Sequence, residues 1–220
     1  MDWDAIALTT RLALSTAGIL FLFAVPLAHW IAMTKWRGKT VLEAIIALPL
    51  VLPPTVVGFY LLMAMGPNGP FGAVYHELTG GMLPFSFGGI LIASIIFNVP
   101  FAVRPLVAGF ESVDRRLIDM SRTLGNGRLK TFFTVTLPLS WQGLLASLVL
   151  TFAHTLGEFG VVLMVGGNIP GTTRTLSIAI YDNVQSMNYA SANRSALVLL
   201  GVAFVVMWIT TVLGRRRMPV

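Results

Sequence analysis

The sequence predicts an all-α membrane protein with about five transmembrane helices. Composition, apolar stretches and charge placement each support this fold class. Only 11% of the 220 residues are charged, whereas soluble domains typically carry about 25%. A mean hydropathy of +0.80 also fits a chain that lies largely in lipid. We therefore expect residues 1–220 to form a single integral membrane domain without a separate soluble domain.

Five uncharged stretches are long enough to cross a bilayer, which requires roughly 20 apolar residues. They cover residues 12–34, 44–76, 78–103, 131–157 and 195–214. The second and fourth are longer than one span and must include loop or interfacial residues. The first follows an acidic N-terminus and exceeds the roughly 7–15 apolar residues of a secretory signal, so we expect a retained helix.

Prolines interrupt the first three spans, the third of which centres on residues 88–110. Proline removes a backbone hydrogen bond and bends a helix, and lipid tolerates this only where neighbours or water satisfy the freed carbonyl. Two interpretations stay open: ordinary kinked packing, or bends that shape a pathway. The prolines concerned are Pro26, Pro49, Pro53, Pro54, Pro100 and Pro105.

Two longer connections join the spans on the side opposite most of the basic residues. Residues 66–86 are rich in Gly and Pro, which predicts turns and a short surface helix. Residues 167–190 predict a loop followed by an interfacial helix from Leu176 to Val184, where the pattern is mildly amphipathic.

Basic residues are distributed unequally between the two sides of the predicted membrane domain. If the five spans alternate in direction, most of the 15 Lys and Arg fall on one side. Because positive charge stays on the cytoplasmic side, we expect the C-terminus inside and the N-terminus outside. The net charge of +6 is then a topology signal with a secondary attraction to anionic lipid, and it does not indicate nucleic acid. The cytoplasmic set is Lys35, Arg37, Lys39, Arg104, Arg115, Arg116, Arg122, Arg128, Lys130, Arg215, Arg216 and Arg217.

A polar segment, residues 111–138, lies between the third and fourth spans. Its apolar residues Val113, Leu117, Met120 and Leu124 recur at helical spacing, which predicts an amphipathic helix. Gly125 follows at once, where a glycine commonly ends a helix.

The second half of this segment predicts a turn and another helix. Asn126-Gly127 forms the turn, Arg128 to Val135 form a second short helix, and Pro138 suits the first turn of the fourth span. Such a helix-turn-helix either lies on lipid or docks in a groove of another protein, and periodicity alone leaves both uses open.

The spacing within this segment resembles the coupling loop of ABC-importer permeases, in which Glu-Ala-Ala is followed by a glycine and then by Ile-x-Leu-Pro. Here Asp119-Met120-Ser121 stands in place of Glu-Ala-Ala, Gly125 follows three residues later, and Val135 and Leu137-Pro138 complete the pattern. The resemblance implies that these residues contact a partner ATPase.

Further blocks along the chain resemble the molybdate permease subfamily of ABC importers. They lie at residues 48–58, 110–117, 147–160 and 167–175. This resemblance implies a type I ABC importer transmembrane domain that moves molybdate, and tungstate as well, across the cytoplasmic membrane. It also implies a homodimer of permeases, two ATP-binding subunits and an external substrate-binding protein. A permease for sulfate, thiosulfate or another oxyanion is the nearest alternative, followed by a membrane-anchoring subunit without transport.

Few polar groups lie inside the predicted spans, and these are the remaining candidate site residues. His154 and Glu158 stand one helical turn apart and could pair, either as a gate or interface or as a structural pair. Arg174, among threonines of the outer loop, is a candidate anion contact or a solvated or partner-bound arginine.

The sequence contains no motif for chemistry of its own. It has no cysteine, no phosphate-binding Gly-x-x-x-x-Gly-Lys-Ser/Thr loop and no metal-ligand spacing among its 3 histidines. We therefore expect a transport subunit that is not an enzyme and holds no metal, with ATP and magnesium bound by the partner ATPase.

Overall fold

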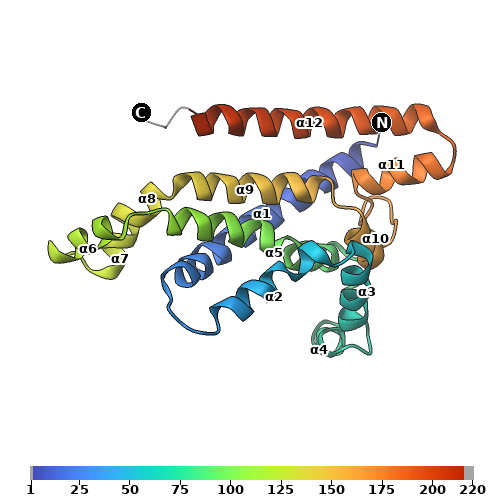
Figure 1. Cartoon of the computed structure of the whole chain (residues 1–220). Coiled ribbons are helices and arrows are strands. Elements are labelled where there is room, and N and C mark those ends of the chain that lie inside the picture. The colour runs from blue at the N-terminus through green and yellow to red at the C-terminus, as the bar shows by residue number, and fades with distance from the viewer. Residues whose placement is uncertain (1, 216–220) are drawn as a thin grey trace.

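The structure is a computed structural model that describes residues 2–215, with side chains to residue 212, and within this part all regular secondary structure is helical. Three helices, α1, α5 and α9, pack side by side and form the centre of the molecule (Figure 1). Small residues of α1 such as Ala24 and Ala28 lie fully buried against Val103, Leu106 and Phe110 of α5. Their bounds are Trp3–Met33, Phe87–Glu111 and Trp141–Leu156.

The helices α5 and α9 approach most closely at two glycines. A Cβ atom on Gly143 would lie 2.7 Å from the Cα atom of Gly109, and one on Gly109 would lie 2.8 Å from the Cα atom of Gly143. Small residues allow membrane helices to approach backbone to backbone, so this glycine pair sets the α5–α9 separation.

The second predicted span is divided into two helices instead of forming one kinked helix. Helix α2 (Lys39–Val51) and helix α3 (Pro54–Met65) meet at an angle of 109°. Pro53 and Pro54 end the first helix and begin the second, because proline lacks an amide hydrogen and suits only the first turn. The bend expected from these prolines is therefore a break of the helix and not a kink within it.

Helix α3 is held in this orientation by a short helix from a distant part of the chain, α10 (Gly160–Gly166). A Cβ atom on Gly58 would lie 2.7 Å from the Cβ atom of Met164, and one on Gly160 would lie 3.0 Å from the Cβ atom of Pro54. Glycines on both helices therefore permit the close contact. The sequence did not predict α10, which was expected to belong to the fourth span and its outer loop.

The first and last spans both begin earlier than their uncharged stretches predicted. Helix α1 starts at Trp3, where the Asp2 carboxylate accepts the Ala5 amide hydrogen at 3.0 Å. Arg11 does not end it, because its guanidinium lies 4.2 Å from the ring centre of Phe87. Helix α12 spans Tyr189–Arg215 and includes Arg194.

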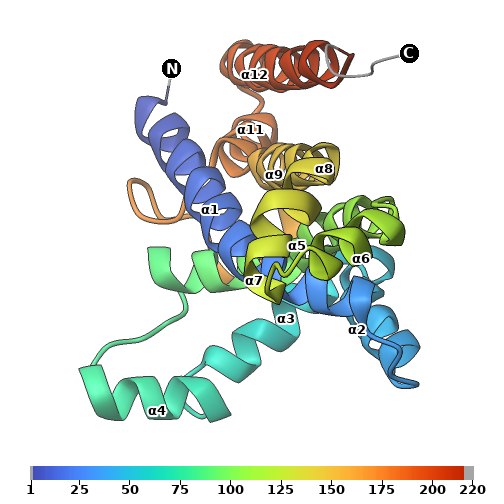
Figure 2. The same ribbon diagram turned by 90° about the vertical axis from the view of Figure 1, so that its left-hand side faces the viewer.

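Helix α12 lies apart from the other helices, in contact mainly with α9 and α11 (Figures 1 and 2). Only 6% of its membrane-length window is buried within the described chain. Two shorter helices were expected, and both are present: α4 (Pro70–Thr79) in the Gly- and Pro-rich connection, and α11 (Leu176–Gln185) before the last span. In Figure 2, α4 projects on the side opposite α12.

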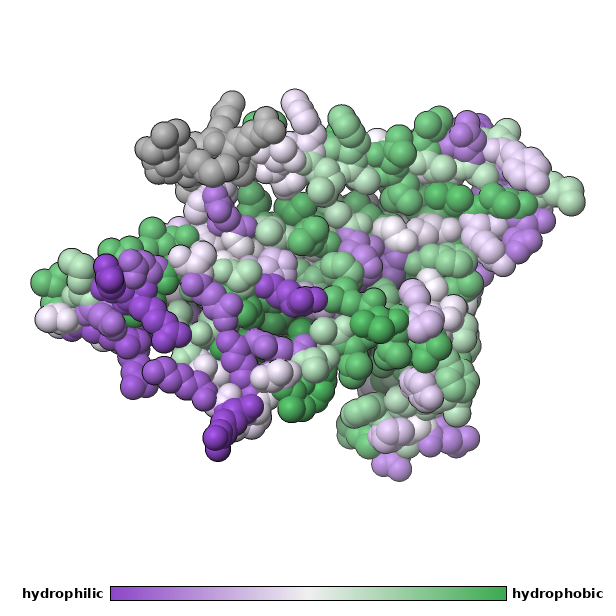
Figure 3. Space-filling view, viewed as in Figure 1, coloured by the Kyte–Doolittle hydropathy of each residue, from purple (hydrophilic) through white to green (hydrophobic). Residues whose placement is uncertain are grey.

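Among the described residues, three helices are long and apolar enough to cross a membrane, or up to five if each bent helix pair is one span. This confirms the predicted fold class. The loop between α1 and α2, the polar segment and the last turns of α12 lie toward the same end of the molecule, where hydrophilic residues gather (Figures 1 and 3). We call this the basic end.

One basic residue assigned to the cytoplasmic loop lies elsewhere. Arg104 was counted with that loop, but α5 continues through Pro105 to Glu111, in agreement with the predicted span over 88–110, and holds Arg104 about two turns before its end. The charge itself suggested a span end, and proline within α5 did not terminate the helix.

Candidate functional site

The polar segment at the basic end begins with helix α6 (Arg115–Thr123). The Asp114 carboxylate caps it by accepting the Arg116 amide hydrogen at 2.9 Å. Val113 and Ile118 are both buried, at the two positions that commonly pack together around a helix start. These contacts fix the direction in which α6 leaves the end of α5.

A glycine ends α6 as the sequence predicted. Gly125 has a φ of 85°, its amide donates to the Arg122 carbonyl at 3.0 Å, and the Asn126 amide donates to the Ser121 carbonyl at 3.2 Å. This pair of hydrogen bonds defines the Schellman motif, which requires a left-handed residue at its turn. The backbone therefore reverses within three residues.

The return half of the segment is helical but contains a π-helical stretch. Helix α7 (Arg128–Thr131), the π-helical Phe132–Thr136 and helix α8 (Leu137–Leu139) follow one another, and the chain then bends by 70° into α9. Pro138 thus lies in α8, and the expectation that it opens the fourth span was wrong. The bend falls after it, at Ser140, and α9 begins at Trp141, so the two parts form a broken span only together.

A buried serine joins the two halves of the segment. The Ser121 hydroxyl lies 3.1 Å from the Thr131 hydroxyl and accepts a hydrogen bond from the side-chain amide of Asn126 at 3.2 Å. Only 6% of Ser121 is exposed, so this side chain holds α6 against α7 and does not face outward. Of the other predicted coupling residues, Asp119, Met120 and Pro138 are exposed, and Val135 and Leu137 are half-buried.

The predicted apolar stripe divides between the interior and the surface. Val113 is buried, whereas Leu117, Met120 and Leu124 are 43%, 60% and 81% exposed. Ile118, which the stripe omitted, takes the buried position of α6. We group the exposed members with two exposed apolar residues of the return half and, after the role that the sequence predicts, call them the coupling face: Leu117, Met120, Leu124, Leu129 and Phe133.

A second polar site lies between α5 and the end of α9. Asn98 is fully buried, and its amide nitrogen donates to a Glu158 carboxylate oxygen at 3.1 Å. Its amide oxygen lies 2.8 Å from the His154 Nδ1 atom. Helix α9 ends at Leu156, so Glu158 is not on the same helix as His154, and no direct pair of the two is present among the described residues. The expected pairing is therefore bridged by Asn98.

A cavity of about 560 Å³ adjoins this polar cluster and is lined by the start of α3, by α5 and by the α9–α10 connection. The His154 ring is stacked on Phe101 with 3.8 Å between ring centres, and Phe97 lies beside it. Pro54 and Thr55 line the opposite wall. The broken span thus brings its bend next to the buried carboxylate, where a polar solute can meet protein groups instead of lipid.

Arg174 is held by its neighbours. Its Nη2 atom lies 3.4 Å from a carboxylate oxygen of Asp182 in α11, and its Nε donates to Asn168 at 2.6 Å. Thr173 is buried, and its hydroxyl donates to the Gly166 carbonyl at the end of α10 at 2.6 Å. These contacts stabilise the loop against α11, and an anion contact at Arg174 stays a prediction.

Comparison with known proteins identifies the setting of these features. Residues 24–218 match the model of the binding-protein-dependent transport system inner membrane component family. The chain belongs to this family. It is 47% identical over 94% of its length to the molybdenum transport system permease protein ModB of Azotobacter vinelandii, of which it covers 92%. It is also 30% identical over 97% of its length to the sulfate transport system permease protein CysW of Synechococcus elongatus, of which it covers 74%.

The fold agrees with this family. A bacterial ABC transporter that imports the polysaccharide alginate has a chain superposing with a TM-score of 0.74, at 19% identity, over 97% of this chain and 80% of that chain. The protein is therefore a multi-pass inner membrane component with the transmembrane fold of a type I ABC importer. Its relatives in the family are transport permeases, in keeping with a non-enzymatic role.

Proposed function

We propose that this chain is the permease subunit of an ATP-driven importer that moves molybdate, and tungstate as well, into the cytoplasm. The observation that carries the proposal is the 47% identity, over nearly the whole chain, to a molybdenum transport permease. The coupling face agrees with it, because an exposed apolar surface beside a rigid turn suits docking in a protein groove.

We assign the basic end to the cytoplasm and the N-terminus to the outside. The loop before α2 and the helices α6 and α7 carry basic residues and lie toward one end of the molecule, to which the end of α12 also points (Figures 1 and 3). Positive charge retained inside orients such proteins. The coupling face then meets the cytoplasm, where ATP is available.

The working assembly in this proposal contains two copies of the permease, two ATP-binding subunits and an external substrate-binding protein. The permeases enclose the pathway, and the ATP-binding subunits hold ATP and magnesium against the coupling faces. Of the predicted coupling residues, Asp119 and Met120 are exposed on α6 and available for that contact.

Transport follows from alternating access. ATP can shift the permease between inward-open and outward-open states only through contacts that differ between the states. The Schellman turn and the Ser121–Thr131 contact make the segment rigid, so a displacement of the coupling face is passed to α5 and α9, between which it is inserted. The cavity beside Asn98 lies between α3, α5 and α9 and changes shape when these helices move.

The proposal is tested by reconstitution. The permease is purified with its ATP-binding partner, inserted in liposomes and supplied with the cognate external binding protein. Uptake of radioactive molybdate that requires ATP, and that tungstate inhibits, is the expected result. Uptake of radioactive molybdate without ATP contradicts the proposal. So does an ATP-dependent uptake of the label that an excess of unlabelled molybdate or tungstate does not reduce.

Sulfate is the second candidate, because the chain is 30% identical to a sulfate permease over 97% of its length. The same liposomes decide between the two anions. An excess of sulfate should leave molybdate uptake unchanged, and calorimetry of the binding protein should show heat with molybdate and none with sulfate. The reverse pattern assigns sulfate.

A further inference from the structure

Helix α5 carries an unpaired cation inside its length. Arg104 is exposed and lies seven residues before the end of this 25-residue helix, about 10 Å from that end at 1.5 Å per residue. Among residues 2–212, whose side chains are described, no hydrogen bond or ion pair involves its guanidinium. A charged side chain at membrane depth is unfavourable unless it faces protein or water.

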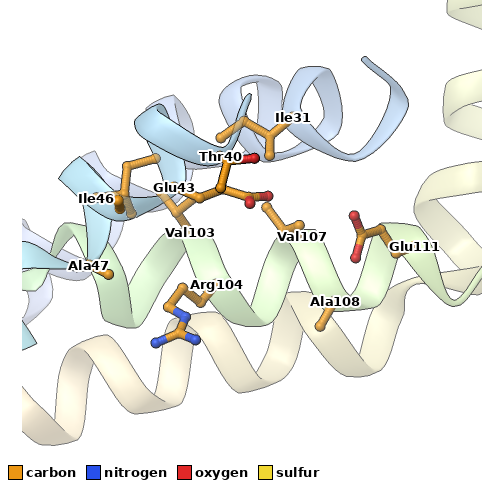
Figure 4. Close-up of a pocket in the computed structure, with 11 residues that line it drawn as sticks. Ile31, Thr40, Glu43, Ile46, Ala47, Val103, Arg104, Val107, Ala108 and Glu111 are labelled. Carbon is orange, nitrogen blue, oxygen red and sulfur yellow. The ribbon is translucent and has the colours of Figure 1, made fainter. Parts of the chain in front are cut away.

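Neither carboxylate near Arg104 forms an ion pair with it, and both lie close to one lysine instead. Arg104 shares a groove of about 460 Å³ between α2 and α5 with Glu43 and Glu111. The Lys39 ammonium lies 2.8 Å from Glu111 and 3.6 Å from Glu43. In Figure 4 the guanidinium of Arg104 points away from both carboxylates. The guanidinium of Arg104 therefore has no ion-pair partner among the described residues and is open to a solute.

The side of α5 that borders the polar cavity also carries Arg104, nearer the basic end of the helix. Phe97, Phe101 and Arg104 follow at spacings of four and three, which places them on one side of the helix. The first two contact the His154 ring, which forms a wall of that cavity. A solute leaving the cavity along this side of α5 toward the cytoplasm passes Arg104 within about one helical turn.

We propose that Arg104 binds the transported oxyanion on the inner half of the pathway. The inference rests on the proposed function. A guanidinium presents a planar set of N–H donors that matches two oxygens of one anion. Two copies of the permease present two such groups, and their two positive charges match the two negative charges of a tetrahedral dianion such as molybdate. The exposed, weakly held position suits passage, because a conduit must also release its solute.

The chain contains no cysteine, so Arg104→Cys creates a single reactive thiol. We expect ATP-driven molybdate uptake by the Arg104→Cys complex to fall about tenfold to hundredfold, the range for losing a charged hydrogen bond. Yield of the complex and its basal ATPase rate should stay unchanged. A thiol reagent that attaches a positively charged ammonium should restore uptake several-fold, whereas a neutral or sulfonate-bearing reagent should not.

Two controls separate this effect from others. Arg194→Cys removes an arginine on exposed α12 that bonds only to its own helix, and its uptake should match that of the unmodified chain. The cysteine-free chain with the same partners, treated with each reagent, reports any reaction on the other subunits.

Normal uptake by Arg104→Cys, or equal rescue by neutral and charged reagents, overturns the inference. An arginine that only anchors the helix at the interface would instead lower complex yield, and loss of yield with unchanged uptake per complex also counts against it. If Arg104→Cys does not assemble, Arg104→Lys must retain more uptake per complex than Arg104→Gln. Failure of the unmodified complex to move molybdate contradicts the proposed function itself, and the same variants then apply to whichever oxyanion it does move.

Discussion

Replacing Gly125 with alanine tests whether the turn of the polar segment depends on its left-handed backbone. The φ of Gly125 is 85°, a conformation that disfavours L-residues by about 1–2 kcal/mol. No atom lies within 4 Å of the added Cβ atom, so the backbone alone opposes the substitution. We expect the Schellman turn to weaken by this amount, a factor of about 5 to 30 in its equilibrium.

Gly127 supplies the matched control two residues away. Its φ is −65°, which alanine adopts freely, and a Cβ atom there also meets nothing within 4 Å. Gly127→Ala should therefore leave the turn unchanged or slightly more stable. Gly125→Asn should fall between the two alanine variants, because asparagine tolerates the left-handed region better than alanine.

Two measurements follow the turn. The backbone amide hydrogen of Asn126 donates to the Ser121 carbonyl, and its exchange rate should rise by about 5- to 30-fold in Gly125→Ala. The affinity for the ATP-binding partner should decrease in parallel, since a displaced turn misplaces the coupling face. Equal exchange and equal affinity for alanine at positions 125 and 127 would refute the reasoning about this turn.

Three other predictions follow from contacts within the membrane domain and its outer loop. Gly143→Leu should lower the melting temperature in detergent by several degrees because the side chain collides with the α5 backbone, whereas Gly201→Leu on α12, where no atom lies within 4 Å, should not. Asn98→Leu strands a buried carboxylate and should destabilise the protein by about 1–3 kcal/mol and lower uptake, and an unchanged melting temperature would contradict the bridge. Arg174→Ala should raise the KM of uptake if this arginine contacts the anion. Asp182→Asn removes only the salt bridge to Arg174 and should lower the free energy of unfolding by less than about 1 kcal/mol. Normal uptake kinetics in Arg174→Ala would remove the anion role.

Local signals in the sequence predicted the elements that local physics determines. Gly125 ended its helix because the Schellman turn needs only the residues within it. Helices α4 and α11 formed where the pattern placed them, and the three long candidate spans overlap uncharged apolar stretches.

Features that depend on distant contacts were not predictable. The pattern could not show that Ile118 would face inward in place of Leu117, since both are apolar neighbours on one helix. Asn98 bonds to residues 56 and 60 positions further along the chain, and the sequence signal that could have indicated this bridge is an asparagine within an apolar span. The partner of Arg174 likewise comes from a different element, α11.

The bend between α2 and α3 affects how the chain enters the membrane during synthesis. The two helices have 13 and 12 residues, about 20 Å and 18 Å in length, so neither alone crosses a hydrocarbon layer of about 30 Å. Helix α3 packs on α10, which begins roughly 95 residues after α3 ends, and ribosomes need about 5 to 19 s to add that length. The unsatisfied carbonyls at the break must meanwhile stay beside water or the insertion machinery. Integration of this segment is therefore a late event, completed only when α10 has been made, and a chain truncated before Gly160 should remain bound to the insertion machinery.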